Sequence, residues 1–409
     1  MGKKYDVLIL CQFFHPEVVS SAILPFETAE DLVKKGLNVK VLCGMPKNKR
    51  REEKPLSKET INGIEIKRLK YAQLPKASKI GRLINYFSFL FAIILNWPRL
   101  INNKCTLVYS NPPVLPVITS INKGLFKVKY IFVSYDIYPD IALMTKQIKQ
   151  NSFLHKLMNS INNRVDRNAD RIIALSHDMK TYILKNRRGF DDSKITVIPN
   201  WYDNNGLDVL SEIEDDEIVA LRKKYSLIIL YSGNMGIAQD IQTIIDVAKS
   251  SKNNKEILFI FTGSGQKVEH LKSEIHNYQL NNVKFYKFLT GAKYIDMLKA
   301  SDMHVITLIN GLEGMAVPSK TYSYMAVGRP IIALMNDNTD IAKDIKLHNL
   351  GCVIKSGNVE KFLDYIRYLQ NNKTEIEKIG KRVRNVFSEN YTREMCTAKY
   401  YEVIAKTIA

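Results

Sequence analysis

The feature that most constrains the fold is an alternation of short apolar runs with longer helical stretches, which occurs twice along the chain. Runs of this length between helices are typical of parallel strands buried on both faces. The first series comprises 5–10, 38–44, 64–70, 106–110, 129–136, 171–175 and 194–199. The second comprises 227–233, 256–263, 283–289, 303–309 and 330–335. The pattern predicts two doubly wound α/β domains.

The boundary between these domains falls near 200–210, where NWYDNNGLD is polar and rich in turn residues. We therefore expect an N-terminal domain over 1–200 and a C-terminal domain over 201–389, and 409 residues are enough for two cores. A last amphipathic helix is predicted over 390–409. The segment 46–60 is charged and lacks apolar periodicity, which predicts a mobile loop.

The charge of the chain is concentrated in its first half. Residues 1–200 contain 33 Lys and Arg against 16 Asp and Glu, a net charge of +17, whereas residues 201–409 contain 27 against 25, a net charge of +2. No acid occurs between Glu65 and Asp136. Eleven basic residues lie in that stretch: Lys67, Arg68, Lys70, Lys76, Lys79, Arg82, Arg99, Lys104, Lys123, Lys127 and Lys129. A basic half of this kind indicates an anionic membrane or a nucleic acid as partner.

An aromatic and aliphatic segment, 84–100 (INYFSFLFAIILNWPRL), lies inside the acid-free stretch. Its uninterrupted apolar part, 89–95, is far shorter than the ~20 residues that a membrane span needs. The segment therefore predicts either a shallow helix beside anionic headgroups or a buried helix of the N-terminal domain. No helix-turn-helix or RNA-recognition pattern accompanies the charge, so we expect no nucleic-acid partner.

The five cysteines are scattered, without a CxxC pair. Cys11, Cys43 and Cys105 lie in or beside strand-like runs, where small buried thiols are common. This usage predicts a reduced cytoplasmic setting and no metal site. The apolar run after the N-terminus is too short for a signal peptide.

The segment 313–332 (EGMAVPSKTYSYMAVGRPII) predicts a loop, a short helix and a buried strand. Ser319 is expected to cap the helix, with Lys320 in its first turn. A lysine stabilises a helix poorly at this end, where free N–H groups and the dipole favour an anion such as a diphosphate. Lys320 is thus a candidate diphosphate ligand, although a solvated lysine on an ordinary helix explains the local pattern equally well.

Two glycine-containing loops follow strands of the second series. Gly233, Asn234 and Gly236 follow the first of them, and Gly263 and Gly265 follow the next. Ligands of open α/β sheets bind beyond the carboxyl ends of strands, and glycines there let a phosphate approach backbone N–H groups. Plain turns are the alternative for both loops.

In the first domain, candidate residues follow two strands. Ser20 and Ser21 stand at the start of the first helix, where their N–H groups can meet a phosphate or an acceptor. Asp136 follows the strand 129–136 in SYDIYPD. It is a candidate for orienting an acceptor hydroxyl or accepting its proton, and a turn or N-cap aspartate is the alternative.

Several of these segments together resemble the family 4 retaining glycosyltransferases, which have the GT-B fold. The segment 313–332 resembles their donor-binding helix, VIPNWYD (197–203) their interdomain hinge, and YSGNMG (231–236) the first loop of their nucleotide domain. QFFHPEVVSSA (12–22) resembles the strand–loop–helix that lines their cleft, and it makes His15 a candidate. The nearest branch is that of the bacterial capsule and O-antigen transferases, including enzymes that handle N-acetyl-fucosamine.

The resemblance implies two Rossmann-like doubly wound domains that face each other across a cleft, with the final helix returning to the N-terminal domain. It implies a UDP-sugar as the donor substrate, no cofactor and no metal ion. The loop with Phe288 and Leu289 matches the place where relatives hold the uracil ring, although Phe288 is equally suited to the core.

The chain departs from the family at the charged positions of the nucleotide domain. The arginine and lysine that neutralise the diphosphate in many relatives correspond to Asn234 and Gln239 here. Lys320 is therefore the leading cationic candidate. Of the two acids of the family's E-x7-E motif, the second corresponds to Ser323, and Glu313 lies two residues from the first position, where it can bind a donor-sugar hydroxyl.

The resemblance thus predicts a retaining, metal-independent glycosyltransferase of surface polysaccharide synthesis, acting on a polyprenyl-diphosphate-linked acceptor at the cytoplasmic face of the plasma membrane. A GT-B-type UDP-sugar epimerase and a noncatalytic membrane-associated binding module are the alternatives. The apolar stretch within a basic half disfavours the epimerase, whereas the two missing charges favour the binding module.

Overall fold

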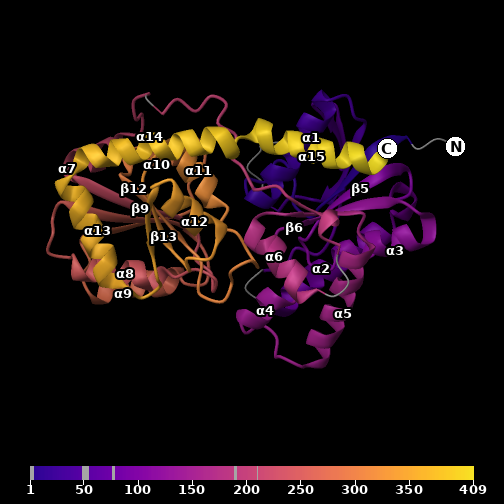
Figure 1. Ribbon diagram of the computed structural model, residues 1–409, viewed down its shortest axis with the longest axis horizontal. Helices are drawn as coiled ribbons and strands as arrows, with labels where there is room; N and C mark the ends of the chain where they lie inside the picture. Colours follow the sequence, from indigo (N-terminus) through magenta and orange to yellow (C-terminus); the bar gives the residue numbers. More distant parts are fainter. Residues whose placement is uncertain (1–3, 48–54, 76–78, 188–190, 210) are drawn as a thin grey trace. The chain divides into compact units, whose positions relative to one another are not determined.

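The computed structural model describes residues 4–47, 55–75, 79–187, 191–209 and 211–409. The chain forms two compact units, each built on one sheet that has helices on both faces (Figure 1). Unit 1 comprises Met1–Asn200, Gly314–Val317 and Arg393–Ala409, and unit 2 comprises Trp201–Glu313 and Pro318–Thr392. The predicted fold class of two doubly wound α/β domains is confirmed.

Unit 1 contains an eight-stranded sheet in the order β3-β4-β2-β1-β5-β6-β7-β8, in which only the β3–β4 pair is antiparallel. The strand order reverses between β1 and β5, and open α/β sheets bind ligands at such a switch point. The strands are β1 (Tyr5–Leu10), β2 (Val39–Gly44), β3 (Lys58–Ile61), β4 (Ile64–Leu69), β5 (Asn103–Tyr109), β6 (Lys129–Ser134), β7 (Arg171–Ala174) and β8 (Ile195–Val197).

Several helices of unit 1 contact this sheet and bury apolar side chains there. In α1, for example, Ala22, Ala29 and Leu32 are fully buried at helical spacing. The helices are α1 (Ser20–Lys34), α2 (Lys79–Ile94), α3 (Pro116–Phe126), α4 (Asp140–Met144), α5 (Phe153–Asn168), α6 (His177–Asn186) and α15 (Arg393–Ile408), with short 3₁₀ turns η1 (Trp97–Arg99) and η2 (Asp192–Lys194).

The last helix, α15, packs against α1. The guanidinium of Arg393 forms ion pairs with Glu30 at 2.9 Å and with Asp31 at 2.8 Å. These half-buried pairs attach the end of the chain to the first helix of unit 1.

Unit 2 contains a six-stranded, all-parallel sheet in the order β11-β10-β9-β12-β13-β14, whose strand order reverses between β9 and β12. Its inner strands β9, β10, β12 and β13 are buried along nearly their whole length, as expected for parallel strands with helices on each side. The strands of this sheet are β9 (Leu227–Asn234), β10 (Ile257–Ser264), β11 (Val283–Tyr286), β12 (Met303–Thr307), β13 (Ile331–Leu334) and β14 (Gly351–Ile354).

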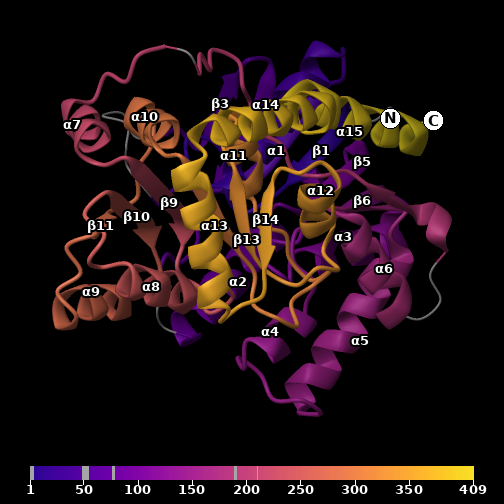
Figure 2. The ribbon, with the colours of Figure 1, turned by 60° about the vertical axis from the view of Figure 1, so that its left-hand side comes forward.

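Helices cover both faces of the unit 2 sheet, with α8 and α9 on one side and α10 and α14 on the other (Figure 2). The helix α11 packs against α14 and follows the loop after β12. The helices are α7 (Asp216–Lys224), α8 (Ile241–Ser250), α9 (Val268–Asn277), α10 (Ala292–Ala300), α11 (Lys320–Val327), α12 (Asp340–Leu347), α13 (Val359–Asn371) and α14 (Lys373–Asn390).

The prediction of a loop over 46–60 is wrong for its last three residues. Lys58–Ile61 is the edge strand β3, paired with β4; residues 48–54 lie outside the described part of the chain. An edge strand buries little, so it needs no apolar run. The segment 84–100 also differs from one continuous helix, because α2 ends at Ile94 and η1 follows. Lys76 lies outside the described residues.

Among the helices that the structure describes, none is both long and apolar enough to cross a membrane. The five cysteines carry free thiols, and Cys11, Cys43 and Cys105 are buried as the sequence predicts. Burial raises the pKa of the Cys43 thiol to about 12, which keeps it protonated and unreactive.

Candidate functional site

The carboxyl ends of β9 and β10 in unit 2 approach each other more closely than side chains allow. Gly263 pairs in register with Gly233, and a Cβ on Gly263 would lie 1.9 Å from the carbonyl oxygen of Gly233. A Cβ on Gly265 would lie 2.5 Å from the carbonyl oxygen of Met235. Both glycines have φ near +143°, a region that side chains rarely adopt. The two predicted glycine loops therefore form one continuous edge at the ends of β9 and β10, beside the switch point between β9 and β12.

Lys320 lies against this glycine edge. Its Cγ is 3.5 Å from the position that a Cβ would take on Gly233. Its ammonium lies over two aromatic rings, 5.6 Å from the ring centre of Phe288 and 4.8 Å from that of Tyr294. The structure thus brings together Lys320, Gly233 and Phe288, and it holds a cation beside the end of β9.

Tyr324 fixes the helix that carries Lys320. Its hydroxyl accepts a hydrogen bond from the N–H of Ser232 at 2.7 Å and donates one to the carbonyl of Ser232 at 3.2 Å. Its ring packs on His304, with ring centres 4.4 Å apart. Burial lowers the pKa of His304 to about 3, so this support is a neutral imidazole at physiological pH. The sequence offered no signal for this role of Tyr324.

Ser319 occupies the predicted N-cap position of α11, but the expected capping by its side chain is not observed. Ser319 has helical dihedral angles, φ −63° and ψ −20°, and its side chain makes no capping hydrogen bond. A capping side chain requires an extended backbone at the cap, and Ser319 already turns with the helix. Its hydroxyl is therefore not used to satisfy the N–H groups at the start of α11.

A second cation, Lys267, lies in the same unit and was missed by the sequence reasoning. Its ammonium donates a hydrogen bond to the carbonyl of Gln239, and its N–H donates to the carbonyl of Met235 at 2.9 Å. Burial lowers the pKa of Lys267. Lys267 therefore adds a second positive charge near this loop. The only signal in the sequence is a lysine two residues after Gly265.

The remaining residues of the first loop form a local network. The side-chain oxygen of Gln239 accepts hydrogen bonds from the N–H of Gly236 at 3.1 Å and from the amide of Asn234 at 3.5 Å. Asn234 is exposed. Leu289 is half-buried in the loop after β11.

Near the positions where the resemblance implies two acids, the structure has the hydroxyls of Ser323 and Tyr294 and the carboxylate of Glu313. The hydroxyls of Ser323 and Tyr294 lie 3.2 Å apart. Glu313 accepts a hydrogen bond from the N–H of Gly311 at 2.8 Å through Oε2, whereas its buried Oε1 has no protein partner within the described residues. Glu313 therefore retains a buried acceptor for a ligand hydroxyl.

In unit 1, His15 lies in the loop after β1, and contacts of both its ring and its backbone hold this loop in place. Its ring stacks on Phe26 with ring centres 4.5 Å apart, and its carbonyl accepts a hydrogen bond from Arg68 at 2.7 Å. Arg68 is fully buried and is ion-paired with Glu59 of β3. Ser20 and Ser21 are the first two residues of α1, after Val19 at the cap position.

Asp136 lies at the end of β6, where its surroundings disfavour a charge. Its N–H approaches the hydroxyl of Ser110 at 3.4 Å, and its backbone forms an isolated bridge with Ala316. The neighbouring N–H of Ile137 donates to the carbonyl of Met315 at 3.0 Å. Burial raises the pKa of Asp136 to about 6. A carboxyl of this kind can both accept and return a proton near neutral pH.

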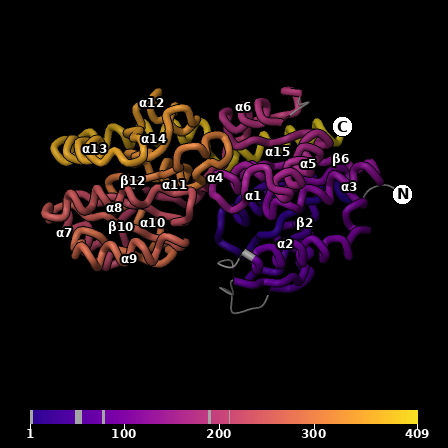
Figure 3. Tube along the Cα trace, turned by 90° about the horizontal axis from the view of Figure 1, so that it is seen from below, coloured from indigo at the N-terminus to yellow at the C-terminus, as the bar shows by residue number. Residues whose placement is uncertain are grey.

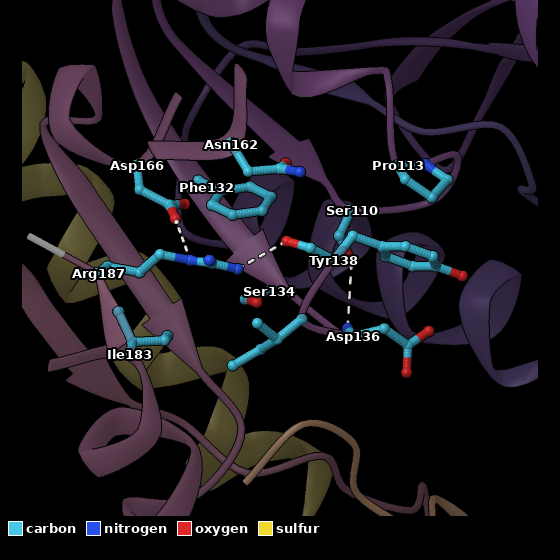
Figure 4. Close-up of a pocket in the computed structure, with 11 residues that line it drawn as sticks. Ser110, Pro113, Phe132, Ser134, Asp136, Tyr138, Asn162, Asp166, Ile183 and Arg187 are labelled. Carbon is cyan, nitrogen blue, oxygen red and sulfur yellow. Dashed lines mark hydrogen bonds and ion pairs between the residues drawn. The ribbon is translucent and has the colours of Figure 1, made fainter. Parts of the chain in front are cut away.

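A pocket in unit 1 has Asp136 on its wall (Figure 4). Its lining includes Ser110, Ser134, Asn162, Asp166 and Arg187. Burial raises the pKa of Asp166 to about 7, although Arg187 lies 3.4 Å from it and acts in the opposite direction. Asp140, the second acid of SYDIYPD, is an ion-pair partner of Arg187 at 2.5 Å, which gives it a structural role.

Within the described residues, no group of three or more His, Cys, Asp or Glu side chains has the arrangement of a metal site. Unit 2 offers cations and backbone amides at the end of its sheet, and unit 1 offers carboxyls with raised pKa values.

Each half of the chain matches a glycosyltransferase family model. Residues 25–205 match the family model described as Glycosyltransferase Family 4, and residues 212–386 match Glycosyl transferases group 1. The probable glycosyltransferase WbjE of Pseudomonas aeruginosa is 24% identical over 337 residues, which cover 80% of this chain and 82% of the relative.

Solved glycosyltransferases have the same fold. HepE of Anabaena, in complex with UDP, aligns with a TM-score of 0.71 and 15% identity over 98% of this chain and all of that one. WaaG, a glycosyltransferase involved in lipopolysaccharide biosynthesis, aligns with a TM-score of 0.66 and 12% identity over 97% of this chain and 99% of that one. At such identities the likeness establishes the fold only.

Proposed function

We propose that this chain, which is a glycosyltransferase of the GT-B fold, moves a sugar from a UDP-sugar to a lipid-linked saccharide with retention of anomeric configuration. The observation that carries the proposal is the glycine edge of unit 2, where Lys320 and Lys267 lie beside the carboxyl end of β9. Two cations and an edge that side chains cannot block suit a diphosphate. The UDP complexes of the structurally similar HepE support UDP as the nucleotide.

The proposed setting is the synthesis of a bacterial surface polysaccharide such as capsule or O-antigen. A relative in Escherichia coli, 24% identical over 181 residues, is described as a putative colanic acid biosynthesis glycosyl transferase. The net charge of +17 in residues 1–200 suits an acceptor held at an anionic membrane. We therefore place the enzyme peripherally at the cytoplasmic face of the plasma membrane, with a polyprenyl-diphosphate-linked acceptor. An N-acetylated amino sugar is the proposed donor group.

In the proposed reaction, the bond between the anomeric carbon and the diphosphate oxygen breaks while the bond to the acceptor oxygen forms on the same face. Negative charge builds on the leaving diphosphate, and the ammonium groups of Lys320 and Lys267 stabilise it. Asp136 orients the acceptor hydroxyl and accepts its proton. Glu313 holds a hydroxyl of the donor sugar through Oε1. The UDP-sugar is a substrate, and no cofactor or metal ion takes part.

The test is incubation of the purified protein with a panel of UDP-sugars, with and without a polyprenyl-diphosphate-linked saccharide. A transferase releases UDP and extends the lipid-linked acceptor only when both are present. An epimerase converts one UDP-sugar into another without acceptor, and a binding module does neither. Either of the last two results would contradict the proposed function.

A further inference from the structure

The helix α2 of unit 1 has an entirely apolar exposed face. The exposed fractions of its outward side chains range from 44% at Ile84 and Ile94 to 70% at Ile80. With 3.6 residues per turn, these positions fall within an arc of about 120°. We call this face the α2 stripe; it consists of Ile80, Leu83, Ile84, Phe87, Phe91, Ile94 and Leu95.

The opposite face of α2 is the one that packs on the unit. Asn85, Phe89 and Ile93 are buried there at intervals of four residues, and the ring of Phe89 lies 5.3 Å from that of Tyr71. α2 contacts β4 and runs along the β2–β4 half of the sheet (Figure 3). The exposed face of a surface helix is normally polar. Because the core already uses the buried face, core packing does not explain the α2 stripe.

The apolar surface continues beyond the end of α2. The ring of Trp97 in η1 lies 6.3 Å from that of Phe126 at the end of α3. Phe126 is 46% exposed, and Leu125 and Ile121 of α3 are 67% and 43% exposed. Trp97, two residues after Leu95, thus places the end of α3 near the end of the α2 stripe. Exposed apolar side chains gathered in this way mark an interaction site rather than scattered surface residues.

Three basic residues, Lys58, Lys67 and Arg99, form a cluster near this surface. Lys58 of β3 and Lys67 of β4 are directly opposite each other across the antiparallel pair. Like charges in that position destabilise a sheet. Burial, and then the charges of Lys58 and Arg99, lower the pKa of Lys67, so Arg99 at the end of η1 belongs to the same cluster. An arrangement that costs stability in this way is expected where an anion is bound.

We propose that the α2 stripe and the end of α3 dock into the headgroup region of an anionic phospholipid bilayer, with Lys58, Lys67 and Arg99 facing the lipid phosphates. This inference rests on the proposed function and names the surface through which the enzyme meets its lipid-linked acceptor. Charge decides between a bilayer and a second copy of the chain: a symmetric contact would set this cationic cluster against itself, whereas anionic lipid neutralises it. The helix lies in the plane of the interface, since none of the described helices is suited to span it.

The inward side of α2 connects this surface to the acceptor side of unit 1. Tyr86 and Tyr138 are each influenced by the charges of both Arg82 and Asp136, and the two charges shift the pKa of each phenol in opposite directions. Arg82 and Tyr86 of α2 therefore lie close to Asp136. Docking of the α2 stripe would present Asp136 to an acceptor whose lipid remains in the bilayer.

The first test removes apolar area without touching the core. Phe87 and Phe91 are 57% and 61% exposed, so F87S/F91S should fold with an unchanged Tm. Leu347 and Tyr368 of unit 2 are 74% and 49% exposed and provide the matched control L347S/Y368S. With vesicles of equal parts phosphatidylglycerol and phosphatidylethanolamine, we expect the vesicle-bound fraction to fall at least roughly tenfold for F87S/F91S and to stay unchanged for the control.

The second test removes charge. K58S/K67S relieves the repulsion between facing lysines, so the variant should be as stable as the wild type or more stable. It should bind the same vesicles roughly tenfold less at low salt, and the difference should shrink as salt screens the wild type. A variant that loses vesicle binding while gaining stability separates membrane attraction from a structural role.

Equal vesicle binding by wild type and F87S/F91S would overturn the proposal, as would a wild type that does not bind vesicles. A wild-type dimer that F87S/F91S converts to monomer, with no vesicle binding, would assign the α2 stripe to a second copy and overturn it too. Binding of UDP by F87S/F91S, measured by calorimetry, should be unchanged. If no transfer is observed with any UDP-sugar but vesicle binding follows the pattern above, the proposed function fails and the docking surface stands.

Discussion

The two sheets end in edges of different chemical character. The carboxyl edge of the unit 2 sheet is lined by glycines and carries Lys320 and Lys267. The edge of the unit 1 sheet carries Asp136, and its pocket carries Asp166, both with raised pKa values. The same architecture thus supplies cations and amides in one unit and proton-exchanging carboxyls in the other. From this difference we infer that unit 2 is suited to bind a diphosphate donor and unit 1 is suited to bind a hydroxyl acceptor.

The largest expected effect comes from removing the central cation of unit 2. Lys320→Ala should lower kcat/KM roughly 100-fold or more, because one stabilising contact to a developing charge is lost. The Tm should change little, since Lys320 contacts aromatic rings rather than an acid. Lys287→Ala, an exposed lysine near the same loop, is the control. If Lys320→Ala is as active as the control, Lys320 has no catalytic role. The proposed difference between the cationic edge of unit 2 and the carboxyl-bearing edge of unit 1 would then be contradicted.

Glu313 tests whether the sugar and the nucleotide are held by different groups. Glu313→Gln keeps the shape of the side chain and removes its charge, so transfer should fall roughly 10- to 100-fold, as for loss of a hydrogen bond to a charged acceptor. Affinity for free UDP should stay unchanged in calorimetry. The exposed Glu360→Gln is the matched control. A parallel loss of UDP affinity would indicate a misfolded loop instead of a sugar contact.

A variant of Lys267 tests whether this lysine supplies the positive charge that the loop after β9 lacks. Lys267→Met keeps the aliphatic length and should weaken UDP binding about tenfold, because one charge-assisted contact is lost. The exposed Lys255→Met should bind UDP like the wild type. Equal UDP affinity of both variants would leave Lys320 as the single cation of the site and make Lys267 a loop-stabilising residue.

The role of Asp136 in unit 1 can be tested through the pH dependence of protein stability. Burial raises the pKa of Asp136 from an ordinary 3.8 to about 6. The ionisation of Asp136 therefore lowers the free energy of unfolding as pH rises from about 4 to 6, and this loss of stability stays constant at higher pH. Asp136→Asn should therefore be more stable than the wild type at pH 8, by roughly 1–3 kcal/mol, and equally stable near pH 4.

Transfer should behave in the opposite way for this residue. The wild-type rate should rise with pH through about 6 as Asp136 loses its proton, and Asp136→Asn should lose both activity and this rise. A variant that keeps the wild-type pH profile would show that Asp136 is only a turn residue.

Most strands could be predicted from the sequence because parallel strands buried on both faces are short apolar runs. The two exceptions are β3 and β14. Lys58–Ile61 alternates between exposed and half-buried positions at a sheet edge, and Gly351–Ile354 has four residues and begins with a glycine. Neither contains an apolar run that stands out from its surroundings.

Candidate site residues could be predicted when the signal lies within one continuous segment. They could not be predicted when the site forms only where segments distant in the sequence meet. Lys320 was found because a cation at a helix start is unusual. Lys267 was missed because only the tertiary fold brings its ammonium to the carbonyl of Gln239. Ser319 was assigned as a cap from its residue type alone, which does not determine backbone dihedral angles.

The most direct test of the central claim is a crystal structure of the protein with bound UDP. We expect the diphosphate at the glycine edge of unit 2, contacted by the ammonium groups of Lys320 and Lys267 and by backbone N–H groups of residues 233–236. A diphosphate bound away from both lysines, or nucleotide bound in unit 1, would contradict it.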